Sequence, residues 1–156
     1  GHMVLDPDGP LCGCGTRGCF EALASRTAIF KKVKAAVKDG RKTLLMDNGG
    51  NSLTKIRSGK LRRAIEDEDK LSIKVLNETC FYTGLAIANL CNLLNPEVVV
   101  LGGGLVEQLH ATMMPIVREV ALERIMPGAR HVRIMATSLG DDAGITGAAI
   151  LAHDHS

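Results

Sequence analysis

Residues 12–19 read Cys-Gly-Cys-Gly-Thr-Arg-Gly-Cys, which places three cysteines and three glycines in eight positions. Thiolates are soft metal ligands, and a glycine-rich turn can wrap three of them around one tetrahedral ion. A tetrahedral site needs a fourth ligand, and the nearest histidine, His2, stands ten residues before Cys12. The stretch therefore predicts a metal site made by His2, Cys12, Cys14 and Cys19. Three structural thiols without a metal are the alternative.

The composition excludes several classes of protein. The 156-residue chain is 46% hydrophobic and has a formal net charge of +2, so no broad basic face for nucleic acid is expected. Its apolar runs are too short to cross a membrane, and it shows no secretory leader. Five cysteines, an odd number, argue against a fully paired disulfide framework. We expect a protein of the reducing cytoplasm.

Hydrophobic periodicity predicts an α/β protein with parallel strands. The expected helices cover residues 21–38, 70–94, 106–124 and 143–152, and the expected strands cover residues 98–101 and 132–137. Residues 40–60 are expected to form loop, and the charged residues 62–69 a solvated helix face. Cys80 and Cys91 lie eleven positions apart on one helix face, which favours core thiols over metal ligands.

A glycine turn follows the first expected strand. Gly102, Gly103 and Gly104 stand between the strand 98–101 and a helix, where the backbone can approach an anionic ligand closely. The turn is neither a Walker loop nor G-x-G-x-x-G, so a plain strand-to-helix connection is the alternative. Asp141 and Asp142 precede the last helix, and their position favours a helix cap over acid–base or magnesium chemistry.

The cysteine stretch belongs to a longer pattern that resembles the signature of the ROK family (repressor, open reading frame, kinase). The pattern is G-H-x9-C-x-C-G-x2-G-C-x-E, and the matching residues are Gly1, His2, Cys12, Cys14, Gly15, Gly18, Cys19 and Glu21. The resemblance continues through residues 21–25, 94–96, 98–104 and 142–144, and leaves out residues 40–65. Gly1-His2-Met3 also matches the remnant of a cleaved tag followed by a start methionine, so both origins stay open.

The resemblance implies a part of the C-terminal lobe of an actin-like, ribonuclease H-like ATPase fold. It divides residues 1–156 into a zinc-binding loop (1–20), a helical segment (21–94) and a β-α-β-α nucleotide-side segment (95–156). By resemblance, His2, Cys12, Cys14 and Cys19 bind one structural Zn²⁺. His2 and Glu21 bind a sugar by the same resemblance, and Gly102, Gly103 and Gly104 lie against the adenosine of ATP.

Members of the family that phosphorylate sugars also resemble one another in motifs that this sequence lacks. These motifs are an Asp-x-Gly-Gly phosphate loop, an Asn-Asp pair that supplies the base, and a Gly-Thr-Gly segment. We therefore expect the C-terminal part of an ATP-dependent, glucokinase-like hexose kinase that is inactive alone, with ATP and Mg²⁺ bound only by the intact protein. The alternatives are the sugar-sensing part of a ROK repressor and a stand-alone zinc-stabilised interaction domain.

The expected partners follow from this reading. The substrate is a hexose or an N-acetylhexosamine, and no contact with nucleic acid or membrane is expected from this segment. Only two strands are predicted, so their sheet has unpaired edges and an apolar face that chains tend to cover by pairing. We therefore expect a homo-oligomer.

Overall fold

The chain folds into a small parallel sheet with stacked helices on one side and the last helix on the other. The computed structural model describes residues 1–46, 53, 56–137, 139 and 142–154. Its elements are α1 (Phe20–Ala24), α2 (Arg26–Lys38), α3 (Ser58–Glu66), α4 (Lys70–Leu94), β1 (Val98–Leu101), α5 (Gly104–Arg124), the 3-10 helix η1 (Pro127–Ala129), β2 (Arg133–Ala136) and α6 (Ala143–Asp154).

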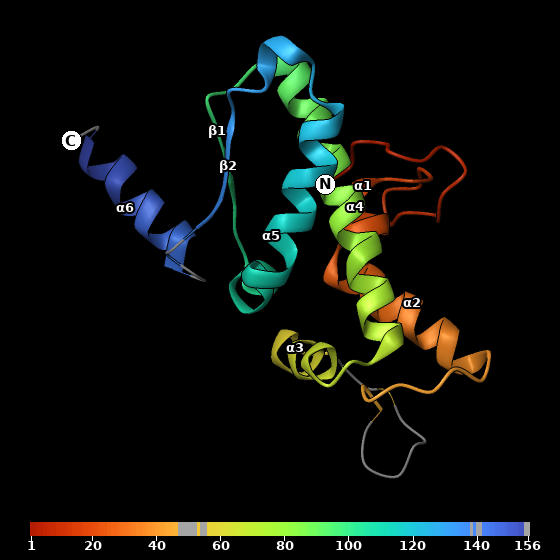
Figure 1. The fold of residues 1–156 in the computed structure, drawn as a ribbon. Helices are drawn as coiled ribbons and strands as arrows, with labels where there is room; N and C mark the ends of the chain where they lie inside the picture. The colour runs from red at the N-terminus through yellow and green to blue at the C-terminus, as the bar shows by residue number, and fades with distance from the viewer. Residues whose placement is uncertain (47–52, 54–55, 138, 140–141, 155–156) are drawn as a thin grey trace.

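The elements are arranged in layers. β1 and β2 pair in parallel, with Val98 opposite Arg133 and Leu101 opposite Ala136, which confirms the predicted α/β class with parallel strands. α5 packs on β2, α4 packs on α5, and α1 and α2 pack on α4. Figure 1 shows α6 on the other side of the two strands from α5. Within the described residues, no helix is long and apolar enough to cross a membrane.

The central layer is α4, whose bounds agree with the predicted helix over 70–94. Cys80 and Cys91 are fully buried in the main hydrophobic cluster, as predicted for core thiols. Burial raises the pKa of the Cys80 thiol to about 12, so it stays protonated and acts as a small apolar group. Gly84 lets α5 approach closely, because a Cβ there would lie 2.7 Å from the Val120 side chain.

Two predicted elements differ from the structure. The single helix predicted over 21–38 is wrong, because the chain is extended at Ser25 (φ −70°, ψ 165°) between α1 and α2. The Ser25 hydroxyl accepts a hydrogen bond from the Ala28 N–H at 3.1 Å, so Ser25 caps α2 instead of continuing α1. In addition, α3 begins at Ser58 and buries Leu61 and Ala64, so it starts before the predicted charged helix face and packs into the core. Of the loop predicted over 40–60, residues 47–52 and 54–55 lie outside the described residues.

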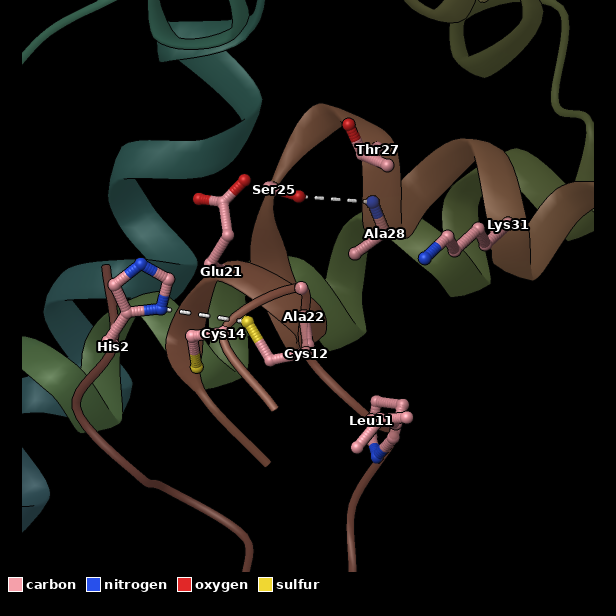
Figure 2. Close-up of a pocket in the computed structure, with 12 residues that line it drawn as sticks. His2, Leu11, Cys12, Cys14, Glu21, Ala22, Ser25, Thr27, Ala28 and Lys31 are labelled. Atoms are coloured by element: carbon pink, nitrogen blue, oxygen red, sulfur yellow. Dashed lines mark hydrogen bonds between the residues drawn. The ribbon is translucent and has the colours of Figure 1, made fainter. Parts of the chain in front are cut away.

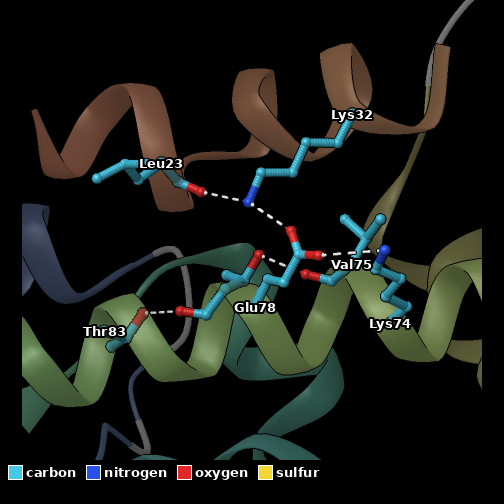
Figure 3. A network of polar contacts seen from close by, with 7 residues as sticks. Leu23, Lys32, Lys74, Val75, Glu78 and Thr83 are labelled. Carbon is cyan, nitrogen blue, oxygen red and sulfur yellow. Dashed lines mark hydrogen bonds and ion pairs between the residues drawn. The ribbon is translucent and has the colours of Figure 1, made fainter. Parts of the chain in front are cut away.

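A polar network fastens α2 to α1 and α4 (Figure 3). The Lys32 ammonium donates to the Leu23 carbonyl at 3.0 Å and lies 3.1 Å from the Glu78 carboxylate. It also lies 5.6 Å from the centre of the Tyr82 ring, within the range of a cation–π contact. Lys32 is therefore held by groups from two other helices.

The N-terminus of α4 is capped by a nearly buried carboxylate. Asp69 is 9% exposed and accepts hydrogen bonds from the Ser72 N–H at 3.0 Å and from the Ser72 hydroxyl. It also accepts from the Thr43 hydroxyl at 2.7 Å, which ties the segment after α2 to the start of α4. Burial by itself raises the pKa of Asp69, but the hydrogen bonds from Ser72 and Thr43 hold it below its ordinary value.

Replacing this cap should destabilise the fold. We expect Asp69→Ala to lower the free energy of unfolding by about 2 kcal/mol, because Ser72 and Thr43 lose their acceptor, and Asp69→Asn to cost less. The folded pKa is lowered, so this contribution is present above the unfolded pKa of about 3.9 and is lost as pH falls through the folded value. Urea unfolding should therefore separate Asp69→Asn from the wild type at neutral pH and bring them together well below pH 4. An equal separation at both pH values would contradict the charged cap.

Candidate metal centre and adjoining pocket

The first twenty residues form a closed loop that is held by backbone bridges. Val4 pairs with Cys19 and Leu11 pairs with Arg17, both in antiparallel bridges. The loop then leads directly into α1, where the Glu21 N–H donates to the Gly1 carbonyl at 2.8 Å. The N-terminal residues therefore lie beside the start of α1, as the metal prediction requires of His2.

Gly18 allows the loop to close on itself. Its φ of +67° lies in the left-handed region, and a Cβ there would stand 1.4 Å from the Asp6 carbonyl oxygen. The Gly18 carbonyl accepts from the Leu5 N–H at 2.9 Å, and its N–H donates to the Pro10 carbonyl at 2.9 Å. Only glycine fits this close approach of two backbone segments, and the approach carries Cys19 to the other ligands.

The four predicted metal ligands lie together, and Figure 2 shows His2, Cys12 and Cys14 of this set. Cys12 Sγ lies 3.6 Å from His2 Nδ1, and Cys14 Sγ lies 3.6 Å from Cys19 Sγ. The ligand atoms of all four residues lie within 4.8 Å of one another. A tetrahedral zinc ion with Zn–S bonds of about 2.3 Å places neighbouring sulfurs about 3.8 Å apart. The donor set and its spacing therefore fit one tetrahedral zinc ion.

The thiols of the cluster differ in acidity. A hydrogen bond from the Thr16 backbone N–H lowers the pKa of the Cys14 thiol to about 6, so this thiol is ionised at neutral pH. Burial, together with the neighbouring Cys14 and Cys12, raises the pKa of the Cys19 thiol to about 11. A metal ion binds thiolates, so its binding displaces the Cys19 proton and weakens as pH falls.

A pocket of about 420 Å³ adjoins the cluster. His2 and Glu21 are at one end of it, and Figure 2 shows the second ring nitrogen of His2 turned away from Cys12, on the side where the Glu21 carboxylate lies. Glu21 is exposed and stands in the first turn of α1, where a negative charge also suits the helix dipole. The two residues predicted to bind a sugar thus line one pocket of a size typical for small ligands.

The pocket also contains residues that the sequence analysis did not identify. They come from the loop and from the start of α2, and include Leu11, Ser25, Thr27, Ala28 and Lys31. The break at Ser25 turns the first face of α2 toward the loop, and residues four apart, such as Thr27 and Lys31, share that face. The serine cap three residues before Ala28 was the available signal, but a continuous helix was predicted across it.

The predicted nucleotide glycines lie at a different place in the fold. Gly103 has a φ of +96° and caps α5, while a Cβ at Gly102 would stand 3.1 Å from the Thr137 side chain. The Thr137 N–H donates to the Leu101 carbonyl at 2.7 Å, so the turn lies at the carboxyl ends of both strands. Ligands bind there in many parallel α/β sheets. Their contact with adenosine stays a prediction.

Of the cap predicted before the last helix, Asp141 lies outside the described residues, and Asp142 is exposed.

Comparisons with known proteins give matches along nearly the whole chain. A family model described as "ROK family" matches residues 1–155. A glucokinase from Thermotoga maritima is 35% identical over 150 residues, which cover 96% of this chain and 47% of that protein. The chain spans about half the length of the curated relatives it matches.

Two solved structures resemble this one closely. A ROK family glucokinase from Streptomyces griseus, in complex with glucose and AMPPNP, matches with a TM-score of 0.78 at 29% identity, over 97% of this chain and 49% of that one. A ROK family transcriptional regulator, described as a homologue of the E. coli MLC protein, matches with a TM-score of 0.73 at 30% identity, over 87% and 33% of the two chains.

A single added methyl group should test the loop closure. In Gly18→Ala the new Cβ meets the Asp6 carbonyl, so we expect a loss of about 3 kcal/mol in stability. The three loop thiols should then react more readily with a thiol reagent. Gly13→Ala is the matched control, because a Cβ at Gly13 meets nothing within 4 Å. Equal thiol reactivity in both variants would contradict this role of Gly18.

Proposed function

The chain belongs to the ROK family, and on that basis we propose that it forms the sugar-binding, zinc-containing part of a glucokinase-like hexose kinase. The observation that carries the proposal is the position of Glu21 and His2 in one pocket that adjoins the four-ligand cluster. The similarity to a glucokinase from Thermotoga maritima and to a glucokinase structure with glucose supports the kinase reading.

Zinc is proposed to be structural. Three thiolates and one imidazole fill a tetrahedron, so no position remains for a reactive water. The ion would join His2 at the start of the chain to Cys19, which directly precedes α1. Its binding energy would therefore stabilise the loop against α1 and α4, and would fix the orientation of the His2 ring.

The proposed sugar contacts follow from the chemistry of the pocket. A carboxylate accepts two hydrogen bonds at once, so Glu21 suits a pair of sugar hydroxyls. With Nδ1 of His2 on the metal side, its Nε2–H is the ring donor that remains for a hydroxyl. Leu11, Ala22 and Ala28 supply apolar contacts for the face of the sugar ring. The substrate class is a hexose or an N-acetylhexosamine.

The remaining parts of the kinase proposal concern the whole protein. The parallel strands and the Gly102–Gly104 turn are proposed to form the adenosine side of an actin-like ATPase lobe, within a longer protein. ATP and Mg²⁺ are proposed to bind the intact protein, whose other segments would supply the base and the phosphate loop. A cytoplasmic location suits free thiols and a zinc–thiolate site.

A sugar-sensing part of a transcriptional repressor is the second candidate. It is favoured by the similarity to a ROK family transcriptional regulator, which has 30% identity over 87% of this chain. The same pocket would then bind an effector sugar without phosphorylating it. Phosphorylation of a hexose by the full-length protein distinguishes the two candidates.

The zinc site predicts a defined stoichiometry. Elemental analysis of protein purified without chelator should give one zinc per chain. Cys14→Ser should lower both zinc content and melting temperature, because it removes a thiolate. His2→Ala should act in the same direction but more mildly, since water can fill the vacant position. Cys91→Ser, a buried thiol outside the cluster, is the control for general destabilisation and should keep its zinc. A zinc-to-chain ratio near zero in the wild type would contradict the proposed site.

The sugar site predicts a specific role for Glu21. Titration of the zinc-loaded chain with glucose and N-acetylmannosamine, followed by NMR, should locate shifts at the pocket. Glu21→Gln should weaken binding about ten- to one-hundredfold, because hydrogen bonds to a charged acceptor are replaced by weaker ones. Glu119→Gln on the exposed surface of α5 is the control and should bind as the wild type does. Equal binding by both variants would contradict the assignment.

Self-association is proposed from exposed apolar side chains on the sheet, on α6 and on the segment between them. They are Val100, Met135, Leu139, Ile145, Ile150 and Leu151. Ile145 is 75% exposed, and such a surface favours pairing. Light scattering should show a species larger than a monomer, and Ile145→Glu with Leu151→Glu should shift it to the monomer. Leu44→Glu, on a separate exposed leucine, should leave it unchanged. A wild-type monomer at all concentrations would contradict the proposal.

A further inference from the structure

The proposed sugar pocket contains a second charged residue besides Glu21. Lys31 lines it from α2, four residues after Thr27 on the same helix face. Figure 2 shows the Lys31 ammonium directed toward the side of the pocket where Ala28 and Ala22 lie. Among the described residues that line the pocket, Glu21 is the only carboxylate and Lys31 the only ammonium.

The next residue along the helix shows how this protein neutralises a lysine. Lys32 lies 3.1 Å from Glu78, donates to the Leu23 carbonyl and lies over the Tyr82 ring. Lys31 makes no ion pair or hydrogen bond within the described part of the chain, and it is exposed at the pocket. The charge of Lys32 is therefore neutralised by contacts within the protein, while the charge of Lys31 remains available to a ligand.

Glu21 and Lys31 thus stand in one pocket without forming an ion pair with each other. A neutral sugar can satisfy the Glu21 carboxylate through its hydroxyls but offers the ammonium no negative charge. A sugar that also carries an anionic group can satisfy both charges at once. Lys34 and Lys38 continue the same exposed face of α2 and add to the positive field at this end.

We propose that Lys31 makes this pocket prefer a sugar that carries an anionic group, a phosphate or a carboxylate, over the same neutral sugar. The proposal rests on the proposed function, because Glu21 must hold the hydroxyls of the same ligand. Thr27, one turn before Lys31, lines the same pocket. The pocket therefore recognises two features of a ligand: Glu21 binds its hydroxyls, and Lys31 binds its anionic group.

The size of the preference follows from the exposure of Lys31. A contact between an exposed ammonium and an anion is screened by water and salt, so we expect an affinity gain of about three- to tenfold. The gain should shrink when ionic strength rises from 0.02 M to 0.5 M, because the Debye length falls severalfold. Binding through the sugar hydroxyls should change little over the same range.

The test compares three ligands on the zinc-loaded chain. Dissociation constants are measured by NMR titration for glucose, glucose 6-phosphate and glucuronate, and inorganic phosphate is titrated alone. Lys31→Gln removes the charge and Lys31→Arg keeps it. Lys34→Gln removes a neighbouring charge of the same face that does not line the pocket. Zinc content and circular dichroism verify that each variant is folded.

We expect one or both anionic sugars to bind more tightly than glucose, and the glucose 6-phosphate and glucuronate arms identify which anionic group is preferred. Lys31→Gln should abolish the preference, Lys31→Arg should restore most of it, and Lys34→Gln should retain most of it. Equal or weaker binding of both anionic sugars, with glucose still bound, would overturn this inference and leave the proposed function standing. An equal loss in Lys34→Gln, or inorganic phosphate bound as tightly as glucose 6-phosphate, would also overturn it. Failure of every sugar to bind would overturn both.

Discussion

The close approach of Gly18 to the Asp6 carbonyl is the constraint on which the site depends. No side chain fits there, since a Cβ would stand 1.4 Å from that oxygen. The contact closes the loop, brings Cys19 to Cys14, and sets the point where α1 begins at Phe20. Because α1 starts one residue after Cys19, the position of Glu21 relative to the cluster follows from the same contact. The closed loop, the cluster of His2 with three cysteines and the adjoining pocket are therefore one structural unit.

That unit rests on α4, which is buried along most of its length. α1 and α2 pack against one side of α4, and α5 with the sheet packs against the other. The Lys32 ammonium joins Leu23 of α1 to Glu78 of α4, and the Asp69 cap holds the start of α4 to Thr43. These polar contacts thus hold α1, which directly follows Cys19, to the helices of the core.

The two ends of the fold differ in how far their apolar surface is covered. At the metal end, buried thiols and backbone bridges close the loop on itself. At the sheet end, two strands stand alone within the described residues, and α6 exposes isoleucine and leucine side chains. An apolar helix and an open sheet edge are unfavourable in water, which favours a partner on that face.

The sequence alone predicted the cluster of His2 with three cysteines, the parallel α/β class and the family, because cysteine–glycine spacing and hydrophobic periodicity are local properties. It also predicted both ends of α4 correctly, because the hydrophobic periodicity of a long helix can be read without knowing what packs against it. Only the tertiary structure decided the break at Ser25, where one hydrogen bond to Ala28 outweighs helix propensity on both sides. That break turns Thr27 and Lys31 toward the loop, so the charge on the far side of the pocket from the metal cluster could not be found from residue spacing. Contacts between segments distant in sequence create a pocket, and no local pattern encodes them.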